Sequence, residues 1–219
     1  MSRTRVAVVV VNCLLAACGW AEAPGGTAVR EPEPILDLPC EGCEEVFNGI
    51  PAALASSARI APVGEPGEAL RLEGTVTDGQ GRPAAGVIVY AYQTDAGGVY
   101  PRDPGAAGRR ISRHGRLRAW AKTDGAGRYR FDTIRPGSYP KSRIPQHIHM
   151  HVIEPGRGTY WIADVVFDDD PYLTAAERGR APERGGKGLT VPRRDAGGTW
   201  LVVRDIRLGE KVPGYPAAR

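Results

Sequence analysis

The sequence lacks any long stretch in which apolar residues recur at helical spacing, which excludes a helical bundle. It also lacks an excess of one charge, since 29 Lys and Arg face 25 Asp and Glu, for a formal net charge of +4. Nucleic-acid binding needs a basic stripe, so that class of function is excluded. Glycine and proline are plentiful instead, with 29 and 19 residues, as is typical of short strands joined by many turns.

Cysteine is scarce, with four residues. Cys13 lies in the segment expected to be removed and Cys18 is expected to carry lipid, so Cys40 and Cys43 are left as a pair. Two cysteines by themselves do not complete a structural zinc site. A thioredoxin-like redox motif needs a neighbouring βαβ pattern, which this sequence does not show. In an oxidising compartment we therefore expect a local disulfide between Cys40 and Cys43.

The N-terminus carries a basic start, then a short apolar run that begins at Val6, too short for a membrane-spanning helix. Residues 1–17 are thus expected to be a signal peptide. The sequence LAAC resembles a lipoprotein processing site with Cys18 as the lipidated residue; an ordinary secretion signal is the alternative. Gly19 favours the outer membrane. This predicts a periplasmic or envelope protein, attached to the membrane only by lipid, with residues 18–39 as a tether.

The remaining sequence predicts an all-β fold, an antiparallel β-sandwich over residues 69–210. Residues 40–68 are expected to form an N-terminal extension with a short helix within 44–58, and residues 211–219 a tail. Alternating or β-branched segments mark the strands. They are LRLEGTV, GVIVYAYQT, LRAWAKT, YRFDTI, IPQHIHMHVI, YWIADVVF and TWLVVRDIRL.

Two connections show further local signals. The turn sequence TDGAGR predicts a hairpin between LRAWAKT and YRFDTI. The polar segment from Asp168 to Gly188 is expected to contain one helical turn near Thr174. Its first three residues, Asp168, Asp169 and Asp170, suggest calcium, but consecutive acids on a strand alternate between faces, so a solvated turn is preferred.

Three of the four histidines lie at alternate positions of one expected strand: His147, His149 and His151. Side chains two apart on a strand share a face, so this row is either a metal site or a solvent-facing row. Tyr100 and Tyr139 lie in loops beside the expected sandwich, and phenolate oxygen is a donor that ferric iron prefers. Taken alone, these positions leave both interpretations open.

Three blocks resolve this, in order along the chain. LEGTVTDGQGRPAAGVIVYAYQTDAGGVY, TDGAGRYRFDTIRPGSYP and PQHIHM together resemble the intradiol ring-cleavage dioxygenases, the family of protocatechuate 3,4-dioxygenase and catechol 1,2-dioxygenase. The resemblance runs from about Leu70 to Leu208.

The resemblance implies a non-haem Fe(III) held by Tyr100, Tyr139, His147 and His149. It implies an oxidoreductase that cleaves a catechol with O₂ to a cis,cis-muconate-type diacid. Tyr139 would leave the metal and help to remove a substrate proton. His151 has no role in the family pattern and is expected to be solvated. The oligomeric state is left open.

The sequence departs from the family at two positions. Ile144 stands where members have an arginine, and Asp164 where many have a glutamine. Arg143 and Asp164 are therefore expected to be catalytic residues in addition to Tyr139. The departures leave an alternative open, a non-catalytic β-sandwich that binds ferric iron or a ferric catecholate. A metal-free scaffold is a third interpretation, which the full set of donors opposes.

Overall fold

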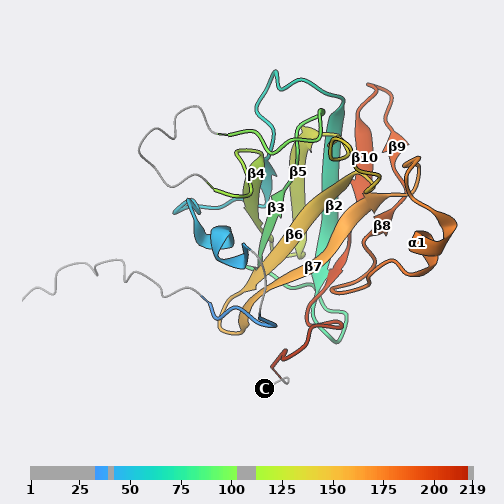
Figure 1. Cartoon of the computed structure of the whole chain (residues 1–219). Helices are drawn as coiled ribbons and strands as arrows, with labels where there is room; N and C mark the ends of the chain where they lie inside the picture. Colours follow the sequence, from blue (N-terminus) through green and yellow to red (C-terminus); the bar gives the residue numbers. More distant parts are fainter. Residues whose placement is uncertain (1–32, 39–41, 103–111, 217–219) are drawn as a thin grey trace, which may run out of the picture. The chain divides into compact units, whose positions relative to one another are not determined.

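The computed structural model describes residues 33–38, 42–102 and 112–216 (Figure 1). The expected signal peptide, Cys18, Cys40 and most of the expected tether lie outside these residues, so the predictions made for them stay predictions. Within the described ranges, no helix is both long and apolar enough to cross a membrane.

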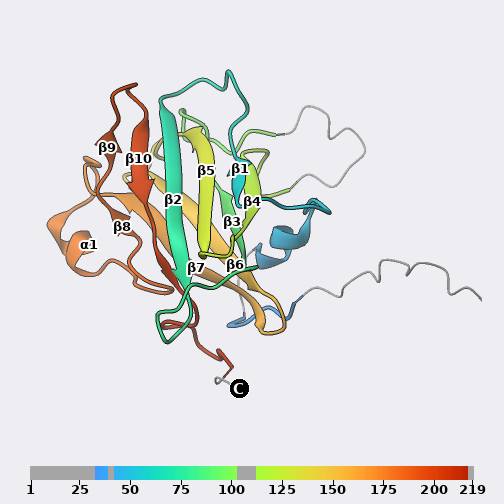
Figure 2. The same ribbon diagram turned by 180° about the vertical axis from the view of Figure 1, so that it is seen from behind.

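The described part is built from two β-sheets (Figures 1 and 2). The first sheet has the order β1-β5-β2-β10-β9, with β11 also paired to β2, and the second has the order β4-β3-β6-β7-β8. In the first sheet the strands are β1 (Ser57–Arg59), β2 (Ala69–Thr77), β5 (Arg128–Ile134), β9 (Arg193–Arg194), β10 (Trp200–Val203) and β11 (Ile206–Arg207). In the second they are β3 (Ile88–Tyr92), β4 (Arg118–Lys122), β6 (His147–Glu154), β7 (Gly158–Phe167) and β8 (Leu189–Thr190).

The centre of each sheet is antiparallel, through β2 with β5 and through β3 with β4 and β6, and β6 continues to β7. This confirms the predicted β-sandwich. Parallel pairs occur as well, because β1 joins β5, β10 and β11 join β2, and β8 joins β7. Strand alternation predicts which face is buried but not the direction of a neighbour, so these pairs were not foreseen.

The core lies between the sheets and follows the alternation of the sequence. On β2, Leu70, Leu72 and Val76 are buried, as the pattern of LRLEGTV predicts. On the facing sheet, alternate residues of β3 and β6 join the same cluster. They include Val89, Ala91, Ile148, Met150 and Val152. The histidines of β6 therefore lie on its outer face.

The predicted hairpin between β4 and β5 is wrong, although both strands form where expected. β4 pairs with β3 in the second sheet, whereas β5 pairs with β1 and β2 in the first. The turn between them does form, since Asp124 accepts hydrogen bonds from the backbone N–H groups of Ala126 and Arg128. It carries the chain from one sheet to the other, a choice that local turn chemistry does not determine.

Two short helices complete the described elements. The helical turn expected near Thr174 is α1 (Ala175–Gly179). It begins with a capping box, in which the Thr174 hydroxyl accepts from the backbone N–H of Glu177 and the Glu177 carboxylate accepts from that of Thr174. The short helix expected within residues 44–58 is the 3₁₀ helix η1 (Cys43–Phe47).

The N-terminal extension packs against the outer face of the second sheet. Val46 of η1 lies in a buried cluster with Tyr90, Trp120 and Ile153. The indole N–H of Trp120 donates to the backbone carbonyl of Val46 at 2.7 Å, which fixes the helix on the sheet. Part of the outer face is therefore covered, and the uncovered part holds the residues described next.

Candidate metal centre

Four side chains that the sequence predicts as donors meet on the outer face of the second sheet. His147 and His149 lie on β6, while Tyr100 follows β3 in a loop and Tyr139 lies in the loop before β6. The Tyr100 phenolic oxygen lies 2.6 Å from that of Tyr139 and 2.9 Å from Nε2 of His149. The Tyr139 oxygen lies 3.0 Å from Nε2 of His147 and 3.3 Å from Nε2 of His149.

The tautomers of both imidazoles follow from their second nitrogens. Nδ1 of His147 lies 2.7 Å from the carbonyl oxygen of Pro145, which can only accept, so Nδ1 carries the proton. Nδ1 of His149 lies 3.1 Å from a carboxylate oxygen of Asp164 and donates to it in the same way. In each neutral ring, Nε2 then presents a lone pair, and the two Nε2 atoms face one another at 3.1 Å.

This arrangement fits a bound cation. The four donor atoms make five close contacts of 2.6–3.3 Å, but the two phenols supply only two protons to bridge them. In the remaining contacts, lone pairs face one another and repel. A cation between the four atoms would attract all of these lone pairs and remove the repulsion. Two imidazole nitrogens with two phenolic oxygens form a donor set suited to ferric iron, because phenolate is a hard anionic ligand.

The surroundings set the protonation of these donors in the absence of a cation. Burial raises the pKa of Tyr100 far above its usual range, and the hydrogen bond with Tyr139 raises it further. Burial also raises the pKa of Tyr139 and lowers the pKa of His147. The phenols therefore hold their protons at neutral pH, and a metal bound by both oxygens must displace them.

A β-bulge brings Asp164 to its position beside His149. On β6, His149 is the single residue between Ile148 and Met150, whereas β7 has both Ala163 and Asp164 in the corresponding interval. The extra residue changes which face the following side chain points to, as bulges beside functional sites often do. The sequence predicted a role for Asp164, but the bulge that determines its partner has no signal in the sequence.

Asp164 also belongs to another possible metal-binding group. Within the described ranges, His147, His149 and Asp164 offer one ligand atom each within 4.8 Å of one another. However, the Asp164 carboxylate already accepts the proton of His149 Nδ1, on the ring edge opposite Nε2. We therefore assign Asp164 to the orientation of His149 rather than to direct binding.

Arg143 does not join this group. Its guanidinium lies over the Tyr172 ring, 5.4 Å from the ring centroid. Ile144, which stands next to it, lines the pocket beside His147. The catalytic role expected for Arg143 stays a prediction, and the side chain of the neighbouring Ile144, which lines the cavity, is apolar.

His151 is buried, so the expectation that it would be solvated is wrong. Its exposed fraction is 4%, and its Nε2 lies 3.6 Å from Sγ of Cys43. The N-terminal extension covers this end of the histidine row, and nothing in the β6 sequence indicates that cover. Cys43 is disulfide-bonded, and because Cys40 lies outside the described residues, their pairing stays a prediction.

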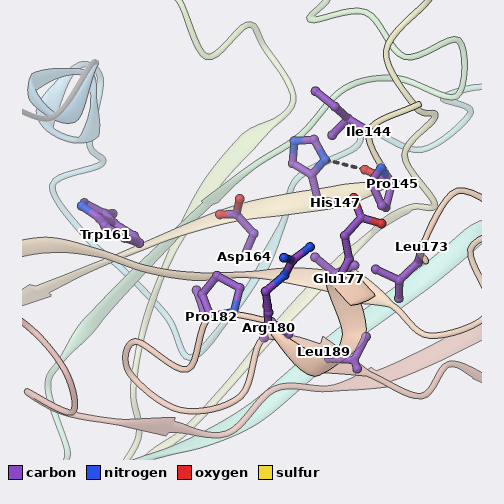
Figure 3. A pocket seen from close by; sticks show the side chains of 14 residues that line it. Ile144, Pro145, His147, Trp161, Asp164, Leu173, Glu177, Arg180, Pro182 and Leu189 are labelled. Carbon is purple, nitrogen blue, oxygen red and sulfur yellow. Dashed lines mark hydrogen bonds between the residues drawn. The ribbon is translucent and has the colours of Figure 1, made fainter. Parts of the chain in front are cut away.

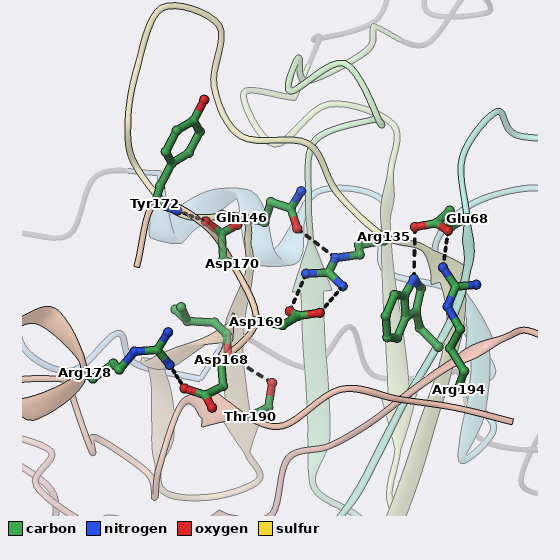
Figure 4. A network of polar contacts seen from close by, with 12 residues as sticks. Glu68, Arg135, Gln146, Asp168, Asp169, Asp170, Tyr172, Arg178, Thr190 and Arg194 are labelled. Atoms are coloured by element: carbon green, nitrogen blue, oxygen red, sulfur yellow. Dashed lines mark hydrogen bonds and ion pairs between the residues drawn. The ribbon is translucent and has the colours of Figure 1, made fainter. Parts of the chain in front are cut away.

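A polar network that the sequence did not reveal holds the start of β6 (Figure 4). The Arg135 guanidinium donates to the Gln146 side chain at 2.8 Å and to both carboxylate oxygens of Asp169. The backbone N–H of Gln146 donates to Asp170 at 3.0 Å. Asp168 instead pairs with Arg178, so the three consecutive acids serve separate contacts and do not converge on calcium.

A cavity of about 360 Å³ opens beside the donors (Figure 3). Its walls come from the segment before β6, from β7 and from α1 with the residues that follow it. Most are apolar, and the polar side chains are those of His147, Asp164, Glu177 and Arg180. The apolar side chains include Ile144, Pro145, Trp161, Val166, Leu173, Pro182 and Leu189. Such a cavity suits one small aromatic ring with limited polar recognition.

Comparison with known proteins agrees with this site. A family model described as a dioxygenase matches residues 51–181, which is more than half of the chain. The protocatechuate 3,4-dioxygenase beta chain of Burkholderia cepacia is 34% identical over 125 residues, 50% of this chain and 49% of that one. The catechol 1,2-dioxygenase of Candida albicans is 29% identical over 117 residues, 46% of this chain and 37% of that one. The match thus spans about half the length of these relatives or less.

Solved structures share the fold. The dioxygenase domain of a dioxygenase and carbohydrate-binding protein fusion from Streptomyces sp. SirexAA-E has a TM-score of 0.55 and 21% identity, over 81% of this chain and 98% of that one. Catechol 1,2-dioxygenase from Pseudomonas arvilla C-1 has a TM-score of 0.53 and 25% identity, over 77% of this chain and 62% of that one. The chain therefore belongs to the intradiol ring-cleaving dioxygenase family.

Proposed function

We propose that this protein is a non-haem Fe(III) dioxygenase that cleaves a catechol between its two hydroxyl-bearing carbons. The observation that carries the proposal is the convergence of two phenolic oxygens and two imidazole lone pairs at 2.6–3.3 Å. Family membership supports the reaction class, and the cavity beside the donors supports an aromatic substrate. The iron, its oxidation state and the product are parts of this proposal.

The reaction needs no oxidant besides O₂. Both oxygen atoms enter the product, so a catechol of formula C₆H₆O₂ becomes a cis,cis-muconic acid of formula C₆H₆O₄. Ferric iron, when bound, supplies Lewis acidity that orients the catecholate and makes it reactive towards O₂.

The side chains of the chain divide the remaining tasks. His147 and His149 act as neutral nitrogen donors, held by Pro145 and Asp164. With ferric iron bound, Tyr100 and Tyr139 would both have lost their protons, and Tyr100 would remain a phenolate. Tyr139, whose oxygen lies within 3.3 Å of both Nε2 atoms, accepts a proton from a substrate hydroxyl. The apolar walls of the cavity, Ile144 among them, contact the ring of the substrate.

The test is the visible spectrum of the iron-loaded protein before and after a simple catechol is added in air. We expect a tyrosinate-to-iron charge-transfer band that weakens strongly in Tyr100→Phe and shifts on catechol addition, followed by growth of a muconate-like ultraviolet product. Val99→Ala, a change at an exposed neighbour of Tyr100, is the matched control and should leave the band unchanged.

Two results would change the proposal. A stable shift without product would make the protein a ferric-catecholate binder, the alternative left open by Ile144 and Asp164 in place of the family's arginine and glutamine. A colourless protein that takes up no iron would contradict the assignment of all four ligands.

We further propose that the chain is carried to the cell envelope and anchored by lipid on Cys18. The sequence LAAC after a short apolar run supports this. Fatty-acid labelling of cells that produce the protein should mark the wild-type chain and not Cys18→Ser. Equal labelling of both would contradict the anchor.

A further inference from the structure

The mechanism leaves a buried cluster behind the candidate metal centre unexplained. His114, which precedes β4, has an exposed fraction of 4%, like His151 on β6. Cys43 and Glu45 of η1 are buried beside them, at 1% each. Burying ionisable side chains is costly, so this cluster calls for a physical reason.

Stacked rings connect this cluster to a candidate ligand. Tyr92 and His149 are paired neighbours on β3 and β6, and their rings stack with centroids 4.5 Å apart and an interplanar angle of 22°. On its other side, Tyr92 stacks on His114 with centroids 3.6 Å apart and an angle of 3°. We call His114, Tyr92 and His149 the ring stack.

The far end of the ring stack is held on two edges. Nδ1 of His114 lies 2.8 Å from the Tyr90 hydroxyl. Its Nε2 faces Gly42, where a Cβ atom would lie only 2.9 Å away. Gly42 also has a φ of +78°, so both the backbone and the contact require glycine at this position.

Gly42 is in turn fixed by the N-terminal extension. It is the residue before η1, whose first residue, Cys43, is disulfide-bonded and lies against His151. Val46 and the Trp120 indole hold the rest of η1 on the sheet. A path of direct contacts thus runs from the extension through the ring stack to His149.

We propose that Tyr92 is a positioning residue for the candidate ligand His149, and that the N-terminal extension holds Tyr92 in place through His114. Asp164 fixes one edge of the His149 ring, and Tyr92 fixes one face. Together they set the direction of the Nε2 lone pair. Partners behind a metal ligand commonly change metal affinity by about 10- to 100-fold when they are removed. This inference rests on the proposed iron site.

The test measures the rate at which the iron-loaded full chain loses iron to excess EDTA. Tyr92→Leu removes the ring and Gly42→Ala places a methyl group against His114. We expect each to speed iron loss by about tenfold or more and to shift the charge-transfer band. Tyr92→Phe keeps the ring and should behave like the wild type.

Gly81→Ala is the matched control for Gly42→Ala. Gly81 has a φ of +80°, close to that of Gly42, but nothing lies within 4 Å of an added Cβ. The two variants therefore carry similar backbone strain, and only one presses on the ring stack. Iron loss within twofold of the wild type in folded Tyr92→Leu would overturn the proposal, as would equal effects of Gly42→Ala and Gly81→Ala.

A second readout separates this inference from the proposed function. If the wild type binds no iron, the proposed function fails while the positioning of His149 can still be measured in the metal-free chain by NMR. With four histidines in the sequence, the ring protons of His149 can be assigned by substitution. Loss of the Tyr92 ring current should move them downfield in Tyr92→Leu. Unchanged shifts would overturn the inference independently of iron.

Discussion

His149 and His151 lie two positions apart on β6, and their side chains share one face. Their surroundings nevertheless differ. His149 has Asp164 on one ring edge and Tyr92 on one face, while its Nε2 points at the phenols. His151 lies under η1 against Cys43. Two histidines on the same face of one strand thus differ in role, because different segments of the chain pack against each of them.

Our first prediction concerns the protonation of His114. Burial is the main cause that lowers its pKa to about 4, Arg118 and His149 add to this, and Glu45 opposes it. An unfolded chain binds this proton near pH 6.5. Stability from neutral His114 is therefore complete above pH 6.5 and is lost as the pH falls towards 4, by up to about 1.4 kcal/mol per pH unit.

Urea unfolding of the metal-free protein between pH 7 and 4 checks this prediction. His114→Gln removes the titration, so its free energy of unfolding should fall less steeply over that interval. The carboxylates remain in both proteins, and the difference between the two curves isolates His114. Parallel curves would show that His114 binds its proton with the same pKa in the folded and the unfolded chain, which would contradict the prediction.

The resemblance to a known family predicted part of the site, and the remainder depends on long-range packing. Residue types alone left the role of Tyr100, Tyr139, His147 and His149 open, and the three motif blocks that resemble the family brought these four residues together as expected ligands. Tyr92 looks like any strand tyrosine in the sequence. Its task depends on His114, which lies 22 positions away and stacks on it only after folding.

At the scale of elements, the alternation of apolar and polar residues predicted the strands and their buried faces. Which strands pair with one another depends on contacts between segments far apart in the sequence. β4 and β5 formed as expected, but their turn joins two sheets instead of closing a hairpin. α1 was foreseen near Thr174 because a capping box is a local signal. The sequence did not predict that α1 forms a wall of the cavity beside His147. The residues that follow α1 return to β7, where the backbone N–H of Ala163 donates to the carbonyl of Arg184, and no local sequence signal indicates this contact.

The second prediction concerns Arg180, which follows α1 and lines the cavity together with His147 (Figure 3). Glu177 is occupied by the Thr174 cap and Asp164 by His149. Within the described part of the chain, Arg180 forms no salt bridge, although its charge lies near the Glu177 carboxylate on the same wall of the cavity. The Arg180 guanidinium can therefore pair with an anionic substituent of the substrate. Arg180→Ala should raise the KM for 3,4-dihydroxybenzoate by about tenfold, the value of one charged hydrogen bond, and that for catechol by less than about twofold.

Arg178→Ala is the matched control, since Arg178 lies on α1 and pairs with Asp168 outside this cavity. It should change neither KM by more than about twofold. Steady-state kinetics with both substrates, followed through the ultraviolet absorbance of the product, give the comparison. Equal effects of Arg180→Ala on the charged and the uncharged substrate would contradict a role in anion recognition.

At the scale of the whole molecule, the candidate centre ties distant parts of the chain together. Tyr100, Tyr139 and the two histidines come from three segments, so a cation bound by all four stabilises the fold as well as the site. Free ligand at about 100 times its dissociation constant adds about 2.7 kcal/mol to the free energy of unfolding. For a domain of this size, we expect ferric iron to raise the Tm by about 5–10 °C.

Thermal unfolding with and without ferric iron, held soluble by citrate, measures this third prediction. Tyr100→Phe should lose most of the shift while the metal-free Tm changes little, because the substitution removes one oxygen and keeps the ring. A Tm shift of the same size in both proteins would indicate that iron stabilises the fold at another place.

The extra residue of β7 has a consequence for comparing relatives. Because one more residue lies on β7 than on β6 between the pairs that flank His149, the two halves of β7 are out of phase by one position. A relative without this irregularity would have one residue fewer here. An alignment without a gap would then pair Asp164 with the wrong residue of the relative. The residue that occupies the same place beside the histidine would be missed, and Asp164 would be read as a substitution. Strand length, as well as residue identity, therefore has to be aligned at this site.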